Sequence, residues 1–213
     1  MIIKRPKYIE AITPFIGQPL VKVLSGVRRC GKSTIFDMLK EELLSSGIDK
    51  KCIITKTYTD MDIAQNITAK QMYDELVCVT KDNACSYLIL DEIQEISGWE
   101  KVVNSLLEKG NCDIYVTGSN AYMLSSEIAT LISGRYIQIE MLPLSFKEYV
   151  ESTGSMNDRG IKYAEYLQNS SFPFTLELKN QPDEIRDYLE GIYNTIVVKD
   201  IINRKKITDT MML

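Results

Sequence analysis

The feature that most constrains this fold is the run GVRRCGKST at residues 26–34. Four of its residues match the pattern G-x-x-x-x-G-K-[ST], namely Gly26, Gly31, Lys32 and Ser33. In such a loop the glycines permit the turn, the backbone N–H groups and the lysine bind phosphate, and the hydroxyl binds Mg²⁺. A β-rich run precedes these residues, and a run with helical spacing follows them. The sequence therefore predicts a strand, a phosphate-binding loop and a helix, in that order.

Segments typical of strands and of helices alternate along the first part of the chain. Strands are expected at residues 20–26, 51–60, 85–92, 112–119 and 135–142. Helices are expected at residues 33–47, 69–80 and 97–110. A capping box of Ser97 and Glu100 is expected to begin the last of these helices. The alternation predicts an α/β fold in which helices cover both faces of a parallel sheet.

The pattern changes after Pro143, where short helical segments replace the alternation. One of these helices is expected to begin at Pro182, with acidic residues in its first turn. We therefore divide the chain into a nucleotide-binding core at residues 1–145 and a helical, lid-like region at residues 146–213. The sequence ends on an apolar run without a polar tail, so we expect the native chain to continue beyond it.

The composition excludes several classes of chemistry and of partner. The chain has no histidine, which excludes Ser-His-Asp and Cys-His catalysis and every zinc site with a histidine ligand. Its five cysteines are scattered and form no C-x-x-C pair, a pattern typical of reduced thiols in a cytoplasmic protein. No run approaches about 18 consecutive apolar residues, and the N-terminus has no apolar signal segment, so neither a membrane span nor secretion is expected.

Two acids, Asp91 and Glu92, directly follow the apolar run YLIL. Carboxylates in this position lie at the carboxyl edge of a parallel sheet, where the ligands of such folds bind. Asp91 is expected to hold Mg²⁺, and Glu92 is expected to act as the general base on the attacking water. The alternative for the same pair is a role in capping a helix.

Two further residues have both a functional and a structural interpretation. Ser119, in the run VTGSN, could sense the γ-phosphate, or it could belong to a turn that uses Gly118 and Asn120. Arg135 could stabilise transition-state charge on the nucleotide of a neighbouring subunit. It could instead pair with a surface carboxylate, and its position in the sequence alone favours this second interpretation.

The remaining loop residues are expected to join the nucleotide site through their backbone N–H groups. They are Val27, Arg28, Arg29, Cys30 and Thr34. Because these amides face the phosphates, the side chains in the middle of the loop should point outward. The two arginines would then serve packing at the surface, or a contact with a subunit or partner. Cys30 is either a small packing residue or a thiol activated by nearby cations.

Taken together, these stretches resemble the prokaryotic AAA-type (AAA+-like) ATPases that are joined to a C-terminal domain of unknown function. The matching runs are SGVRRCGKST, YLILDEIQEISGWEKVVNSLLEKG, DIYVTGSNAYMLSSEIATLISGRY and IEMLPLSFKEY, which together span about residues 20–150. The resemblance implies a P-loop NTPase fold, a three-layer αβα sandwich with parallel strand order 5-1-4-3-2, followed by a small helical region. It also implies that ATP lies at the carboxyl edge of the sheet.

The resemblance implies roles for individual residues as well. Lys32 and Ser33 belong to the Walker A motif and would contact the phosphates and Mg²⁺. Asp91 and Glu92 belong to the Walker B motif and would contact the metal and the attacking water. Ser119 takes the position of the phosphate sensor.

Two more roles follow from the resemblance. Arg135 matches the position of an arginine finger, which strengthens its functional interpretation. The segment before the first strand, with Arg5, Pro6 and Tyr8, lies where it could line the adenine base.

These residues lead to one main hypothesis and two alternatives. The main hypothesis is a slow, Mg²⁺-dependent ATPase that drives a conformational or assembly switch, with ATP, further copies of itself and an unknown protein as partners. The first alternative is a nucleotide-gated interaction module with negligible turnover. The second is a nucleic-acid motor, which the run DEIQ suggests because it resembles a helicase acidic motif. The net charge of −4 and the limited room in 213 residues speak against a motor.

Overall fold

The structure, a computed structural model, describes residues 3–59, 67–81, 85–118, 134–154, 158–178 and 181–196. Two compact units can be distinguished by their internal contacts. The larger contains residues 4–26 and 32–141, and the smaller contains residues 1–3, 27–31 and 142–213. The predicted domains, 1–145 and 146–213, stay a prediction.

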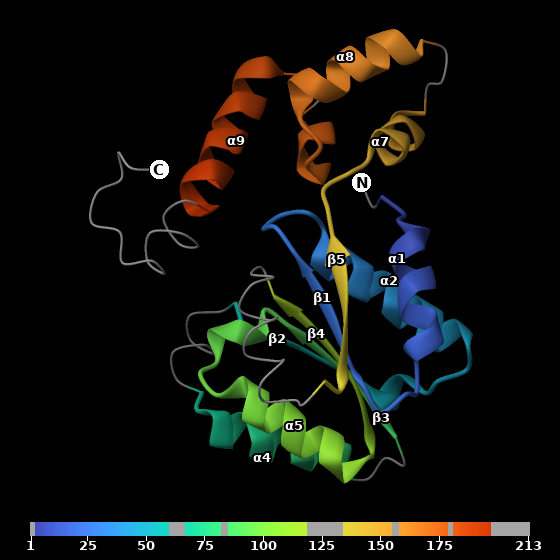
Figure 1. The fold of residues 1–213 in the computed structure, drawn as a ribbon, viewed down its shortest axis with the longest axis vertical. Coiled ribbons are helices and arrows are strands. Elements are labelled where there is room, and N and C mark those ends of the chain that lie inside the picture. Colours follow the sequence, from blue (N-terminus) through green and yellow to red (C-terminus); the bar gives the residue numbers. More distant parts are fainter. Residues whose placement is uncertain are drawn as a thin grey trace. The chain divides into compact units, whose positions relative to one another are not determined.

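Within the described residues, the larger unit contains a sheet of five parallel strands (Figure 1). They are β1 (Val21–Gly26), β2 (Ile53–Thr57), β3 (Ser86–Asp91), β4 (Cys112–Gly118) and β5 (Tyr136–Met141). Their order across the sheet is β2-β3-β4-β1-β5. Read from the other edge, this is the predicted order 5-1-4-3-2, which is therefore confirmed.

Helices cover both faces of this sheet, with α4 and α5 on one side and α1 and α2 on the other (Figure 1). Their bounds are α1 (Pro6–Ile12), α2 (Lys32–Ser45), α4 (Ala69–Thr80) and α5 (Trp99–Lys109). Short 3-10 helices are η1 (Thr13–Phe15), η2 (Lys50–Cys52) and η3 (Ile93–Glu95). Strands β1 and β4 are buried along their whole length because both faces are covered. The three-layer αβα architecture is confirmed.

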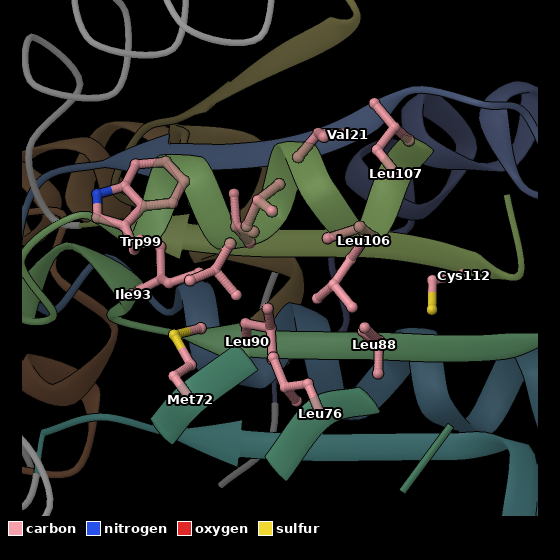
Figure 2. Close-up of a cluster of buried hydrophobic side chains, with 14 of the residues drawn as sticks. Val21, Met72, Leu76, Leu88, Leu90, Ile93, Trp99, Leu106, Leu107 and Cys112 are labelled. Atoms are coloured by element: carbon pink, nitrogen blue, oxygen red, sulfur yellow. The ribbon is translucent and has the colours of Figure 1, made fainter. Parts of the chain in front are cut away.

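An apolar core fills the space between the sheet and helices α4 and α5 (Figure 2). Leu90 of β3 and Val116 of β4 belong to this core, together with Leu76 of α4. Successive side chains of a strand point to opposite faces. Asp91 directly follows Leu90, and Thr117 directly follows Val116. Their side chains therefore point to the face that carries α1 and α2. The core fixes which polar side chains emerge on the other face.

Helix α5 begins differently from its prediction. Its N-cap residue is Gly98, with φ of 80°, and no side chain caps the helix. The predicted capping box of Ser97 and Glu100 is therefore wrong. Glycine reaches this left-handed conformation without a steric penalty, and it turns the chain into the helix by itself. Helix α4, in contrast, does begin with a capping box, formed by Thr68 and Gln71.

The smaller unit is helical. It contains α7 (Phe146–Thr153), α8 (Arg159–Asn169), η4 (Pro173–Leu176) and α9 (Pro182–Thr195). Helix α9 begins at Pro182, as predicted. Aromatic rings join α7 to α8, with the rings of Phe146 and Tyr163 5.3 Å apart between centroids. Among all described helices, none is long and apolar enough to cross a membrane.

A buried ion pair lies at the amino end of the sheet, on the α1 and α2 face. Lys22 and Asp113 are each 2% exposed, and Nζ of Lys22 donates a hydrogen bond to Oδ1 of Asp113. The same carboxylate accepts hydrogen bonds from the Gly17 N–H over 2.7 Å and from the Tyr115 hydroxyl over 2.8 Å. Burial, and then the Asp113 carboxylate, raise the pKa of Tyr115 above its ordinary value. Both carboxylate oxygens of Asp113 therefore have buried hydrogen-bond partners.

Replacing Lys22→Met is expected to lower the free energy of unfolding by about 3–5 kcal/mol, because it leaves the Asp113 charge buried without its cation. Urea unfolding followed by circular dichroism measures this loss. The matched control is Lys70→Met, which breaks the exposed pair between Lys70 and Asp74 and should change stability by less than about 1 kcal/mol. Equal effects of the two variants would contradict a structural role for the buried pair.

Candidate functional site

Lys32 begins helix α2 at the carboxyl end of the sheet and is only 5% exposed. Its Nζ atom donates a hydrogen bond to the carbonyl oxygen of Gly26 over 3.0 Å. The same atom lies 3.8 Å from Oε1 of Glu92. The ammonium group thus lies over the end of β1, next to the loop.

Ser33 and Asp91 meet at this edge of the sheet. The Ser33 hydroxyl donates a hydrogen bond to Oδ2 of Asp91 over 2.7 Å. Ser33 is exposed, whereas Asp91 is buried. Hydroxyl and carboxylate oxygens are ligands that Mg²⁺ prefers, and Mg²⁺ in such sites adds phosphate and water oxygens to them. The two side chains therefore fit a Mg²⁺ ion that arrives together with a phosphate.

The described residues hold no group of three or more histidine, cysteine, aspartate or glutamate side chains that could bind a metal by themselves.

Glu92 has a left-handed backbone, with φ of 53° and ψ of 42°. Such a conformation is uncommon for a residue other than glycine, and strained residues of this kind cluster at functional sites. One carboxylate oxygen accepts a hydrogen bond from Nε2 of Gln94. The other oxygen, Oε1, faces the Lys32 ammonium group. The structure thus brings together four of the predicted residues, namely Lys32, Ser33, Asp91 and Glu92.

Two neighbours of Asp91 were not predicted from the sequence. Thr117 donates a hydrogen bond from its hydroxyl to Oδ1 of Asp91. The N–H of Tyr58 donates to the backbone oxygen of Asp91 over 3.0 Å. Burial, and then the charge of Glu75, raise the pKa of Tyr58, so its phenol stays neutral near pH 7. The signal that could have identified both residues is their position at the carboxyl end of a strand that neighbours β3.

The middle of the loop, residues 27–31, groups with the smaller unit. Gly31 has φ of 99°, a conformation that favours glycine, and Arg29 has φ of 64°. The Arg29 guanidinium lies 5.9 Å from the centroid of the Tyr188 ring in α9, a cation–π distance. Cys30 is completely buried. Its burial favours a packing role for Cys30 over an exposed, activated thiol. Arg29 is exposed, and its guanidinium contacts a ring of its own unit.

The other loop residues differ in their exposure. Val27 is exposed, Arg28 is half-buried, and Thr34 is half-buried in the first turn of α2. Burial raises the pKa of Tyr188 above its ordinary value, although the nearby Arg29 charge opposes the shift. The contacts with nucleotide stay a prediction for all of the loop residues Val27, Arg28, Arg29, Cys30 and Thr34.

Arg135 lies at the opposite end of the sheet from this group. It directly precedes β5, and its carbonyl oxygen accepts a hydrogen bond from the N–H of Val21 at the start of β1. Its Nη2 atom donates to Oδ1 of Asn104 over 2.7 Å and lies 3.4 Å from Oε1 of Glu108. Within one chain Arg135 therefore serves a surface contact to α5. A role on a neighbouring nucleotide stays a prediction.

Two remaining predictions concern the phosphate sensor and the adenine base. Ser119 lies outside the described residues. Arg5 and Tyr8 are both buried, and Nη2 of Arg5 donates to the Tyr8 hydroxyl over 3.3 Å. The Arg5 guanidinium also lies 4.7 Å from the centre of the Tyr8 ring. These two residues bind each other next to Pro6, the first residue of α1, and their contact with adenine stays a prediction.

A parallel sheet of this order, with a lysine-bearing loop after β1 and two acids after β3, defines a P-loop fold of the AAA+ type. The chain belongs to the AAA domain family, which it matches over residues 18–150. The predicted family resemblance is thereby confirmed for the ATPase-type domain.

Curated relatives share this sequence over most of its length. An uncharacterized protein of Haemophilus influenzae is 35% identical over 219 residues, which cover 100% of this chain and 54% of that protein. An uncharacterized protein of Methanocaldococcus jannaschii is 30% identical over 201 residues, which cover 88% of this chain and 43% of that protein. The chain thus spans about half the length of the curated relatives that it matches.

Solved structures share the fold at low sequence identity. AMPPCP-bound DnaA from Aquifex aeolicus has a TM-score of 0.55 at 18% identity, over 95% of this chain and 64% of that chain. PCH-2 from C. elegans has a TM-score of 0.55 at 11% identity, over 89% of this chain and 67% of that chain. ORC1 from Aeropyrum pernix, solved in complex with DNA, has a TM-score of 0.52 at 13% identity, over 70% of this chain and 47% of that chain. At these identities the likeness concerns the fold alone.

Proposed function

We propose that this chain binds ATP with Mg²⁺ and hydrolyses the ATP slowly, and that hydrolysis drives a conformational or assembly switch. The observation that carries the proposal is the convergence of Lys32, Ser33, Asp91 and Glu92 at one end of the sheet. Membership in the AAA domain family supports nucleotide binding, as does the fold shared with a DnaA that was solved with AMPPCP bound.

Binding would begin with the loop at residues 26–34, whose backbone N–H groups would surround the phosphates. Lys32 would place its ammonium group on the β- and γ-phosphate oxygens. In the structure that group faces Glu92 at 3.8 Å. When Lys32 turns to phosphate, this pair loosens and the Glu92 carboxylate is released to bind a water.

Bound Mg²⁺ would neutralise negative charge on the phosphates as the transition state forms. Ser33 would hold the ion through its hydroxyl, and Asp91 would hold it through a water. Glu92 would orient the attacking water and accept its proton. Ser119 is proposed to contact the γ-phosphate and so to distinguish ATP from ADP.

Calorimetric titration of the protein with ATP, in the presence and absence of Mg²⁺, tests the binding part of this proposal. The expected result is that ATP binds and that its affinity is higher when Mg²⁺ is present. Phosphate release measured on the same sample tests hydrolysis. Binding without any release would favour the alternative function, a nucleotide-gated interaction module.

The proposed arginine finger predicts that turnover depends on assembly. Turnover per chain is expected to rise with protein concentration, because Arg135 of one copy would complete the site of another. Arg135→Ala should remove this rise and lower the maximal rate by up to about 10³-fold. Phosphate release over a range of protein concentrations measures both effects.

Arg186→Ala is the matched control, since Arg186 is exposed and its ion pairs among the described residues are with acids of its own helix. It should keep both the rate and its concentration dependence. If Arg135→Ala behaves like this control, the finger is excluded and the surface contact with Asn104 and Glu108 is the whole role of Arg135.

A further inference from the structure

Thr117 occupies a position in β4 from which one hydroxyl group reaches both proposed acidic residues. The residue is completely buried. Its Oγ1 atom donates a hydrogen bond to Oδ1 of Asp91 and accepts one from the N–H of Glu92 over 2.9 Å. Both bonds cross from β4 to the end of β3.

The strand register explains why these three residues meet. Strands β3 and β4 pair in parallel, with Leu90 opposite Val116. The next position on each strand is Asp91 and Thr117, and both point to the face opposite the apolar core. The contact therefore follows from the backbone of the sheet and does not depend on a flexible loop.

The Asp91 carboxylate is consequently held at both of its oxygens. Thr117 donates to Oδ1, and Ser33 donates to Oδ2 over 2.7 Å. Ser33 is exposed, and an incoming ion would replace its hydrogen bond. The bond from Thr117 is buried, so it would keep Asp91 in one orientation while the other oxygen changes partner.

The second bond of Thr117 stabilises the unusual backbone of Glu92. A left-handed residue directly after a strand loses the regular hydrogen bonding of the sheet, and its N–H needs another acceptor. Thr117 supplies that acceptor. The direction in which the Glu92 side chain leaves the strand is thereby tied to the same hydroxyl that orients Asp91.

Packing alone does not account for a threonine at this position. Valine has nearly the same shape and an equal preference for buried strands. A buried hydroxyl, in contrast, destabilises the fold unless it finds partners. Both partners of this hydroxyl are residues of the proposed site, which indicates that its role is in that site.

We propose that Thr117 is a positioning residue that sets the orientation of the Asp91 carboxylate toward Mg²⁺ and the backbone of Glu92 toward the attacking water. This inference rests on the proposed function, and it adds a residue that neither the loop pattern nor the acidic pair identifies. It predicts that the increase in ATP affinity on addition of Mg²⁺ depends on the Thr117 hydroxyl, whereas the ATP affinity without Mg²⁺ does not.

Calorimetric titration with ATP over a range of Mg²⁺ concentrations tests this inference. Thr117→Val should raise the Mg²⁺ concentration needed for half of the metal effect by about 10- to 100-fold, as other changes next to metal ligands do. Binding of ATP without Mg²⁺ should stay unchanged, because the loop and Lys32 are intact. Thr117→Ser, which keeps the hydroxyl, should restore the Mg²⁺ response.

Thr80→Val is the matched control, because Thr80 is also buried and its hydroxyl donates to backbone oxygens of its own helix, α4, and contacts the Cys112 thiol at the amino end of β4. It should leave the Mg²⁺ response unchanged. A normal Mg²⁺ response of Thr117→Val would overturn the role of Thr117, and so would an equal defect in Thr117→Ser. If the unmodified protein binds no ATP at all, the proposed function itself fails, and the inference fails with it.

Discussion

Lys32→Ala is expected to weaken the binding of ATP with Mg²⁺ by about 30- to 5,000-fold, the range that corresponds to about 2–5 kcal/mol for the loss of one partner in a buried, charged hydrogen bond. Lys32 is the buried cation at the end of β1, and its Nζ atom already faces the loop carbonyl of Gly26. Calorimetry with ATP and Mg²⁺ measures the loss directly.

Lys40→Ala is the control for this prediction. Lys40 lies on the same helix, α2, and pairs with Asp37 at the surface. It should bind nucleotide as the unmodified protein does. Circular dichroism of both variants establishes that they are folded. Equal affinities of Lys32→Ala and Lys40→Ala would refute the phosphate-binding role of the loop.

Glu92→Gln is expected to separate binding from hydrolysis. The substitution keeps the shape and polarity of the side chain but removes its ability to accept a proton, so turnover should fall by about 10²–10⁴-fold. Nucleotide affinity should be retained or increase slightly, because Lys32 loses a competing carboxylate 3.8 Å away. Single-turnover phosphate release and calorimetry on the same variant measure the two quantities.

Glu95→Gln provides the comparison for Glu92. Glu95 is an exposed acid three positions further along the chain, in η3. It should keep full turnover. Unchanged turnover in Glu92→Gln would remove this residue from the role of general base and would direct attention to another carboxylate.

The strands and their order could be predicted because strong local signals and a family pattern agreed. The run YLIL ahead of Asp91 is too apolar for a surface strand, and the loop pattern needs a strand before it and a helix after it. Local rules also identified helix α4 and the start of α9 at Pro182. The strand order itself came from the family resemblance, since local pattern does not determine which strands are neighbours.

Two features could not be read from local pattern. The start of α5 was wrong because Ser97 and Glu100 satisfy the capping-box spacing, while the adjacent Gly98 provides a left-handed turn that needs no side-chain cap. The proposed role of Thr117 depends on register across two strands, and sequence periodicity shows only that such a residue is buried. The contacts of the candidate site join residues that lie far apart in the chain, so the local sequence pattern does not show them.

The site also shows why the phosphate loop contains residues other than glycine, lysine and serine. Arg29 has a positive φ and places its guanidinium beside the ring of Tyr188, which belongs to the same unit. Cys30 fills buried space. Neither side chain is needed for phosphate binding in the proposed mechanism, which agrees with their variable positions in the loop pattern.

The left-handed backbone of Glu92 has a consequence for how this position can change. A residue with a Cβ atom in this conformation costs about 1–2 kcal/mol relative to its preferred geometry, a penalty that glycine avoids. Selection for thermal stability alone would therefore favour glycine here, and selection for hydrolysis would retain glutamate. In the proposed mechanism, position 92 is thus a point at which stability and chemistry are in conflict, and a stabilised variant that lost Glu92 would keep the fold and the proposed metal ligands but not the proposed turnover.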